Sequence, residues 1–246
     1  MVDEKSSEYD QKLMKAVKKE IVEGSQVFLD YDGTLVPIVI NPEECYADTD
    51  LRNLLARISK KYQLFIVSGR QISELREFIG IDVNIIGMHG AISYIKGKEV
   101  PLVPDFYQYQ EKVRKIAEMH LEKQFQGLRV YNKSSGILLH LGLVDNILRE
   151  KISERVNELG QESGMDIYRG KDVLELKIPN VNKGDAIRKF RDQTKCLIAG
   201  DEQTDEMAFR ECNECVTIHV GKGPTAARYT VPDVYSFRKI LETLVR

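Results

Sequence analysis

The fold of this chain is decided by the stretch Val27-Phe28-Leu29-Asp30-Tyr31-Asp32-Gly33-Thr34-Leu35. Its three leading apolar residues are typical of a short strand that is buried on both faces, as in a parallel sheet. Two carboxylates follow at positions i and i+2, so both side chains can project toward the same space. Gly33 then allows a tight turn. We therefore expect a strand whose carboxyl end presents a pair of acidic groups.

Strands and helices alternate on either side of this stretch, except in the middle of the chain. The pattern predicts helices at 13–21, 51–58, 72–79 and 183–190 and near 208–209, and further strands at 64–67, 83–86, 196–199 and 216–220. Such alternation is typical of the α/β class, in which helices cover both faces of a doubly wound parallel sheet.

The pattern changes between residues 91 and 179. Ala91–Leu102 carries Gly97 between two short runs and predicts a hairpin, and two helices and four strands follow it. We therefore predict a discontinuous core of residues 1–90 and 180–246 with an inserted α+β cap domain at 91–179. The site is expected between core and cap, with the cap supplying the pocket for the leaving group.

Composition excludes several classes of protein. The 246 residues are 42% hydrophobic and 30% charged, which is an ordinary globular balance. A net charge of −2 gives no basic field for nucleic acid, and no apolar run approaches the roughly 20 residues of a membrane helix. Four cysteines are too few for a disulfide framework, and the spacing of Cys212 and Cys215 is interpreted as an incidental turn. A cytoplasmic location is expected, with neither nucleic acid nor membrane as a partner.

Polar residues with chemical potential follow the predicted strands, where ligands bind in open parallel sheets. They are Asp30, Asp32 and Thr34, then Ser68, Gly69 and Arg70, then Asp201 and Asp205, with Lys183 at the start of a helix. Taken alone, Asp32-Gly33 could be a turn, Ser68 a helix cap and Lys183 a surface lysine. Their coincidence at strand ends favours a site instead.

The residue types indicate phosphoryl transfer. Asp30 is the predicted nucleophile, which would form an aspartyl-phosphate, and Asp32 is the predicted general acid and base. Clustered carboxylates favour Mg²⁺, with Asp30, Asp32 through its carbonyl, Asp201 and the supporting Asp205 as ligands. Ser68 and Lys183, with Thr34 and the amides of Gly69 and Arg70, are expected to bind the phosphate.

These motifs, together with Gly200-Asp201-Glu202-Gln203-Thr204-Asp205, resemble the four motifs of the haloacid dehalogenase superfamily. From about Val27 onward the chain resembles the trehalose-6-phosphate phosphatases within it, including His89-Gly90-Ala91 and Gly170-Lys171-Asp172-Val173-Leu174-Glu175. In that family Lys is usually followed seven residues later by His-Tyr-Arg. Here Lys133 is followed by His140-Leu141-Gly142, and Glu202 and Lys177 replace the usual Asp and Arg.

The resemblance implies Mg²⁺-dependent hydrolysis of trehalose 6-phosphate, with a small sugar phosphate as substrate and a trehalose-phosphate synthase of the same pathway as a partner. His89, Gly90, Lys133 and Glu175 are the expected further contacts to substrate. Three alternatives stay open at this point. One is a phosphatase for sucrose phosphate or mannosyl-phosphoglycerate, another is a phosphomannomutase, and the third is a non-catalytic sugar-phosphate sensor.

Overall fold

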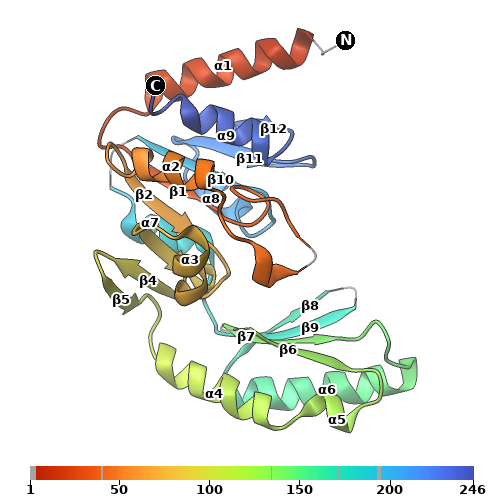
Figure 1. The fold of residues 1–246 in the computed structure, drawn as a ribbon. Helices are drawn as coiled ribbons and strands as arrows, with labels where there is room; N and C mark the ends of the chain where they lie inside the picture. Colours follow the sequence, from red (N-terminus) through yellow and green to blue (C-terminus); the bar gives the residue numbers. More distant parts are fainter. Residues whose placement is uncertain (1–3, 40, 134, 171, 193–194) are drawn as a thin grey trace. The chain divides into compact units, whose positions relative to one another are not determined.

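The computed structural model describes residues 4–39, 41–133, 135–170, 172–192 and 195–246. They form two compact units. The first contains the described residues up to Val100 together with Asn182–Arg246, and the second spans Pro101–Val181 (Figure 1). Within the described residues, no helix is long and apolar enough to cross a membrane.

The first unit is built on an eight-stranded sheet. Its strands are β1 (Gln26–Leu29), β2 (Gln63–Val67), β3 (Asn84–Gly87), β4 (Ile92–Ile95), β5 (Lys98–Pro101), β10 (Cys196–Gly200), β11 (Val216–Val220) and β12 (Tyr229–Val231). Their order is β12-β11-β10-β1-β2-β3-β4-β5. All neighbours from β12 to β3 pair in parallel, and β4 runs antiparallel to β3. The strand that precedes Asp30 therefore lies in the interior of the sheet, between β10 and β2.

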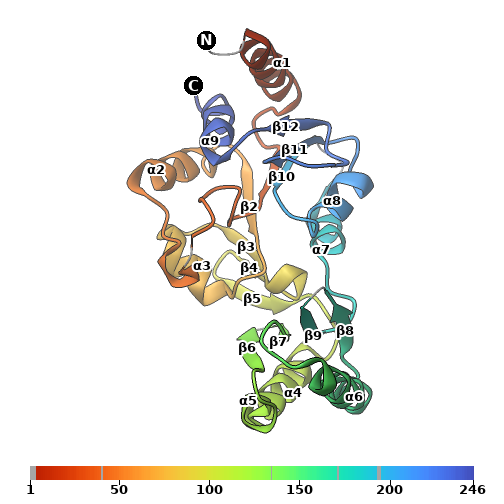
Figure 2. The same ribbon diagram turned by 90° about the vertical axis from the view of Figure 1, so that its right-hand side faces the viewer.

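Helices cover both faces of this sheet. They are α1 (Glu4–Glu20), α2 (Thr49–Ile58), α3 (Ile72–Ile79), α7 (Lys183–Phe190), α8 (Glu206–Glu211) and α9 (Val234–Glu242), with short 3₁₀ turns at Pro42–Glu44 and Met88–Gly90. Figure 2 shows α2, α3 and α9 on one side of the sheet and α7 and α8 on the other. Because both faces are covered, Val27, Phe28 and Leu29 are all fully buried. The predicted doubly wound α/β fold is confirmed.

The second unit is an antiparallel sheet with helices on one face, as expected for an α+β insertion. Its elements are α4 (Phe106–Glu118), α5 (Leu121–Gln124), β6 (Arg129–Lys133), β7 (Gly136–His140), α6 (Asn146–Ser163), β8 (Asp166–Arg169) and β9 (Val173–Lys177). The strand order is β6-β7-β9-β8. Alternate strand residues such as Ile137, Leu139 and Leu176 join Val156 and Leu159 of α6 in one hydrophobic core.

The hairpin at the start of the predicted insertion belongs to the first unit, which corrects the boundary at residue 91. β4 pairs with β3 through the register Ile86↔Ser93, and β5 lies beside β4 at the edge of the core sheet. The units divide at Val100 and again at Val181. The change from crossover to hairpin at Ala91 marks the sheet edge, because an antiparallel strand can extend a parallel sheet without leaving it.

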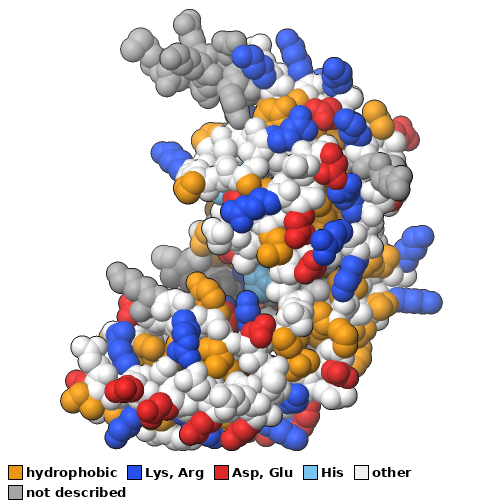
Figure 3. Space-filling model, turned by 180° about the vertical axis from the view of Figure 1, so that it is seen from behind, with side chains coloured by type: hydrophobic (Ala, Val, Ile, Leu, Met, Phe, Trp, Pro, Cys, Tyr) orange, Lys and Arg blue, Asp and Glu red, His pale blue; other side chains and the backbone are white. Residues whose placement is uncertain are grey.

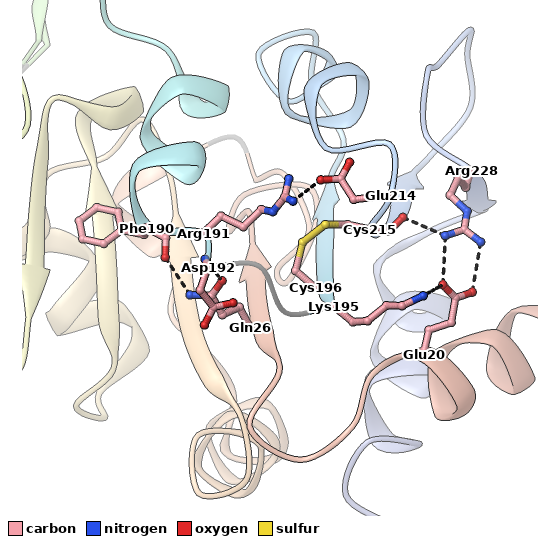
Figure 4. The surroundings of a disulfide bond; sticks show 10 residues. All are labelled: Glu20, Gln26, Phe190, Arg191, Asp192, Lys195, Cys196, Glu214, Cys215 and Arg228. Atoms are coloured by element: carbon pink, nitrogen blue, oxygen red, sulfur yellow. Dashed lines mark hydrogen bonds and ion pairs between the residues drawn. A yellow bond between two sulfur atoms is a disulfide. The ribbon is translucent and has the colours of Figure 1, made fainter.

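A disulfide joins Cys196 to Cys215, with 4.9 Å between the Cα atoms (Figure 4). The cysteines are too few for a disulfide framework, yet two of them that lie far apart in the sequence form this bond. Leu197 pairs with Val216 in neighbouring parallel strands, so the residues immediately before them are also neighbours. Cys45 and Cys212 are buried free thiols.

Acidic and basic side chains are interspersed on the face of the molecule that Figure 3 presents. This mixture accords with the net charge of −2.

Candidate active site

Asp30 directly follows the last residue of β1. Its amide donates to the carbonyl of Ala199 at 2.9 Å, which continues the ladder to β10. The side chain is buried, and its Oδ1 accepts a hydrogen bond from Lys183 Nζ at 2.6 Å. Asp30 Oδ2 is also buried and accepts no hydrogen bond from the described residues. Burial raises the pKa of the Asp30 carboxyl, and the ammonium of Lys183 opposes that rise.

Lys183 is the first residue of α7 and is only 1% exposed. Asn182 caps this helix by accepting from the Asp185 amide at 2.7 Å. Lys183 Nζ also donates to Asp205 Oδ1 at 2.9 Å, so the ammonium lies between two carboxylates. Burial by itself would lower its pKa, but Asp30 and Asp205 raise the pKa above its ordinary value. The surface-lysine interpretation is therefore wrong.

Three carboxylates form a group that suits a hard cation. Asp30, Asp201 and Asp205 each place an oxygen within 4.8 Å of the other two. Asp201 Oδ1 accepts from Thr34 Oγ1 at 3.1 Å, and burial raises the pKa of Asp201. Both oxygens of Asp205 have protein donors, since Oδ2 accepts from the Glu202 amide at 3.1 Å. The unpartnered Oδ2 of Asp30 and the oxygen-only donor set fit Mg²⁺.

Gly33 makes this grouping possible. Its φ is +76°, and a Cβ at this position would lie 2.1 Å from Asp201 Oδ2. The loop after β1 and the carboxylate after β10 can therefore approach only where residue 33 has no side chain.

Asp32 is held by the side chain of Arg70. Arg70 Nε donates to Asp32 Oδ2 at 2.6 Å, and Nη2 donates to Oδ1 at 2.8 Å. The guanidinium also lies over the Phe78 ring, 5.0 Å from its centroid. A second contact comes from Cys45, whose thiol pKa is raised by burial and by its hydrogen bond to Asp32. Among the four predicted metal ligands, Asp32 is thus the one whose carboxylate is hydrogen-bonded to an arginine.

Ser68 and Gly69 form a tight turn after β2. Ser68 is buried, and its Oγ accepts from the Arg70 amide at 3.2 Å. A Cβ on Gly69 would lie 2.3 Å from Nε2 of His89, so this glycine lets the imidazole pack against the turn. His89 has a left-handed φ of 55°, and its amide donates to the Ser68 carbonyl at 2.9 Å. Strained backbone of this kind clusters at functional sites.

Most of the predicted site residues belong to the first unit, and two of them, Lys133 and Glu175, belong to the second. Asp30, Asp201, Asp205 and Lys183 meet directly, and Thr34 joins them through Asp201. Gly90 packs against α7, because a Cβ there would lie 2.7 Å from the Asn182 carbonyl oxygen. Lys133 and Glu175 belong to the second unit, where Lys133 Nζ is 3.5 Å from Glu175 Oε1.

Sequence reasoning missed the partner of Asp32. Arg70 was expected to offer its backbone amide to phosphate, yet its side chain is bound to the Asp32 carboxylate. It also missed Cys45 and the buried Tyr31, whose hydroxyl donates to the Cys45 carbonyl at 2.6 Å. The position of Tyr31 was the available signal. Asp30 and Asp32 share one face of an extended chain, so Tyr31 between them points to the opposite face.

Comparison with known proteins identifies relatives over nearly the whole chain. A model of the trehalose-phosphatase family matches residues 28–234. A trehalose-6-phosphate phosphatase-related protein of Thermoplasma acidophilum is 40% identical over 222 residues, which cover 88% of this chain and 95% of that protein. A crystal structure of a trehalose-6-phosphate phosphatase related protein has a TM-score of 0.79 at 40% identity, over 90% of this chain and 97% of that one.

One relative is a longer protein whose name gives both a synthase and a phosphatase activity. The bifunctional trehalose-6-phosphate synthase/phosphatase of Thermoproteus tenax is 31% identical over 233 residues. The match covers 89% of this chain but only 31% of that protein.

Proposed function

The chain belongs to the trehalose-phosphatase family of phosphoric monoester hydrolases, and we propose that it hydrolyses trehalose 6-phosphate to trehalose and phosphate. The observation that supports this most directly is the buried Lys183 ammonium, which lies 2.6 Å from Asp30 Oδ1 while Asp30 Oδ2 has no protein donor among the described residues. One carboxylate oxygen is fixed by a positive charge and the other is left available. This arrangement suits a nucleophile that meets a phosphoryl group.

In the first step of the proposed reaction, an oxygen of Asp30 attacks phosphorus and the bond from phosphorus to the sugar oxygen breaks. Asp32 gives a proton to the departing alkoxide, and an aspartyl-phosphate forms on Asp30. In the second step Asp32 takes a proton from water, whose oxygen attacks phosphorus. The bond to Asp30 then breaks, which releases phosphate and restores both carboxyl groups to their starting protonation states.

Lys183, Ser68 and the amides of Gly69 and Arg70 would orient the phosphoryl group. The Lys183 ammonium is fixed by two carboxylates, so its charge needs no reorganisation when negative charge develops on phosphoryl oxygens. Ser68 is held at the end of β2 by its amide, which donates to the Ile86 carbonyl at 2.9 Å.

Mg²⁺ is the proposed cofactor, held by Asp30 and Asp201 with Asp205 in support. When bound, it would neutralise charge on the phosphoryl oxygens and relieve repulsion among these carboxylates. Asp205 already accepts from Lys183 and Glu202, so we assign it chiefly to positioning the lysine. The carbonyl of Asp32 stays a prediction as a further ligand.

Sugar recognition is assigned to Lys133 and Glu175, whose charged groups can hydrogen-bond hydroxyls. One observation weighs against the phosphomannomutase alternative, which would need cap arginines to hold a second phosphate. Arg169 of β8 instead donates to Ser153 and Asn157 of α6. We further propose a trehalose-phosphate synthase as a functional partner in the cytoplasm, which the fused arrangement named for the Thermoproteus tenax relative supports.

The test is phosphate release from trehalose 6-phosphate, sucrose 6-phosphate, mannosyl-phosphoglycerate and p-nitrophenyl phosphate by the parent and by Asp30→Asn. We expect trehalose 6-phosphate to be the best substrate. Activity should be lost with EDTA and restored by Mg²⁺ but not by Zn²⁺ alone. Asp30→Asn should fall below about one thousandth of the parent while its far-UV circular dichroism is unchanged.

Each alternative gives a different result in the same assay. Efficient turnover of another sugar phosphate would reassign the substrate, and transfer of phosphate to a sugar instead of water would indicate a mutase. Binding without turnover would indicate a sensor. Asp30→Asn activity within tenfold of the parent would remove Asp30 from the nucleophilic role.

A further inference from the structure

The second unit leaves one face of its sheet without a helix. Figure 1 shows α4, α5 and α6 on a single face of the β6-β7-β9-β8 sheet. Because strand residues alternate between faces, burial of Ile137 and Leu139 in the helix-side core places Leu138 on the opposite face. We call the side of the sheet that bears Leu138 and its cross-strand neighbours the open face.

Strand register assigns further residues to the open face. Tyr131 pairs with Leu138, Leu138 with Glu175, and Glu175 with Tyr168. Directly paired residues share a face, so these four side chains form one row across all four strands. Tyr131 and Tyr168 end the row and are 49% and 51% exposed. Three inter-strand steps separate them, or about 14 Å between Cα atoms.

Two ammonium groups lie beside this row, because Lys133, Gly136 and Lys177 occupy the next row on the open face. Glu175 Oε1 lies 3.5 Å from Lys133 Nζ, and the Glu175 side chain is the less exposed of the pair. Lys177 Nζ lies 6.0 Å from the centroid of the Tyr168 ring. A Cβ on Gly136, which pairs with both Lys133 and Lys177, would lie 2.0 Å from the Leu176 carbonyl oxygen. Glycine at this position therefore leaves the space between the two lysines free of a side chain.

Two aromatic rings at the ends of a row that contains a carboxylate, with two ammonium groups in the next row, match the chemistry of a neutral disaccharide. The C–H faces of a pyranose ring pack on aromatic rings, and its hydroxyls both donate to carboxylates and accept from ammonium groups. The Glu175 carboxylate at the centre of the row would repel a second phosphate, and a protein partner would favour a larger apolar surface than Leu138 offers.

We propose that Tyr131 and Tyr168 are specificity-determining residues of this enzyme, each stacking on one hexose ring of the disaccharide. The inference rests on the proposed function, since it names the residues that recognise the leaving group of that reaction. The phosphoryl chemistry belongs to the first unit, so the tyrosines should govern which substrate binds and leave the reaction of bound phosphate unchanged.

The experiment compares Tyr131→Ala and Tyr168→Ala with Tyr235→Ala, a control tyrosine on α9 that is 63% exposed. We expect KM for trehalose 6-phosphate to rise about tenfold in each test variant, in line with the loss of one stacked ring. The kcat of these variants and their hydrolysis of p-nitrophenyl phosphate should stay within twofold of the parent. Tyr131→Phe and Tyr168→Phe should behave like the parent, because phenylalanine keeps the ring.

A second readout does not depend on turnover. The chain contains no tryptophan, so its intrinsic fluorescence comes from tyrosine, and titration with trehalose itself should change that fluorescence saturably. Tyr131→Ala and Tyr168→Ala should weaken trehalose binding about tenfold, whereas Tyr235→Ala should not. Test variants that match Tyr235→Ala in both KM and trehalose affinity would overturn this inference alone. A parent without activity on trehalose 6-phosphate would overturn the proposed function and this inference together.

Discussion

At Gly33 the backbone adjoins the carboxylate of Asp201, which belongs to the proposed Mg²⁺ site. A Cβ on this residue would lie 2.1 Å from Asp201 Oδ2, and the φ of +76° is one that other residues adopt only with strain. Gly24 provides a matched comparison, because it has a φ of +86° but nothing within 4 Å of a Cβ. Both glycines therefore need a positive φ, but only Gly33 has another group, the Asp201 carboxylate, where a side chain would lie.

We predict that Gly33→Ala lowers activity strongly and raises the Mg²⁺ concentration needed for half-maximal rate, because the methyl group displaces Asp201. Gly24→Ala should keep full activity. Both should lose about 1–2 kcal/mol of unfolding free energy from the positive φ. Phosphate release as a function of Mg²⁺ concentration, with denaturant unfolding of both variants, checks this. Equal activity of the two variants would contradict it.

Arg70 acts on Asp32 through two hydrogen bonds, of 2.6 and 2.8 Å. Lysine cannot make this two-point contact. We predict that Arg70→Lys lowers kcat for trehalose 6-phosphate about tenfold with little change in KM, since the role proposed for Asp32 is proton transfer and not phosphate binding. Arg76→Lys is the control, because Arg76 of α3 also lies over an aromatic ring, that of Tyr94. Steady-state kinetics that show no difference between the variants would remove the positioning role of Arg70.

Helix α1 is attached to the core by an apolar face and by its last residue. Leu13 and Val17 are fully buried, and Glu20 lies 3.1 Å from Arg228 and 3.5 Å from Lys195 (Figure 4). An acidic residue in the last turn of a helix is unfavourable to the helix dipole. The hydrogen bond from Arg228 offsets this and lowers the pKa of Glu20 below its ordinary value of 4.5.

A lowered folded-state pKa means that Glu20 stabilises the fold above pH 4.5 and loses this effect as the pH falls through its folded pKa. We predict that Glu20→Gln lowers the unfolding free energy by up to about 1 kcal/mol at pH 7. This difference from the parent should shrink progressively below pH 4.5. Denaturant unfolding between pH 3 and 7 measures it, with exposed Glu23→Gln as the control. A difference that is independent of pH would exclude the ion pair as its cause.

The disulfide fastens β10 to the start of β11 across a sequence separation of 19 residues. A closed loop of this size restricts the unfolded chain enough to contribute about 3 kcal/mol. We predict that Cys196→Ala and Cys215→Ala each lose about this much, and that the double variant loses little more. Reductant should lower the unfolding free energy of the parent but not of the variants. Additive losses in the single variants would show that packing, and not the bond, is responsible.

At the scale of the whole molecule, the core site was predictable because one physical rule governs it. Asp30, Ser68 and Asp201 come from distant segments, yet each follows an apolar run, and parallel strands end at the same edge of a sheet. Lys183 was predictable because its charge opposes the helix dipole unless an anion is near. The order of the motifs along the chain predicted the family, and the family assignment is confirmed.

The sequence did not predict the disulfide or the contact of Arg70 with Asp32, because these depend on strand register and on side-chain rotamers. Cys196 and Cys215 become neighbours only when β10 and β11 pair as Leu197↔Val216, and apolar runs do not fix that register. Arg70 could point in many directions, and its contact with Asp32 depends on Phe78 lying beneath the guanidinium. The hairpin after Ala91 looked like the start of a new domain because antiparallel pairing also occurs at the edge of a parallel sheet.

The insertion has a consequence for how the protein is made. Lys183 and Asp30 are 153 residues apart, so at about 5–20 residues per second the ribosome needs roughly 8 to 30 seconds between them. During that interval β1, β2 and β3 have emerged without β10, and the second unit, whose contacts are local, is complete first. The nascent chain thus carries an unpaired edge on β1 until β10, Cys196–Gly200, has been synthesised. A chain that ends before Lys183 would expose this strand edge to aggregation and would lack Lys183, Asp201 and Asp205 of the proposed site.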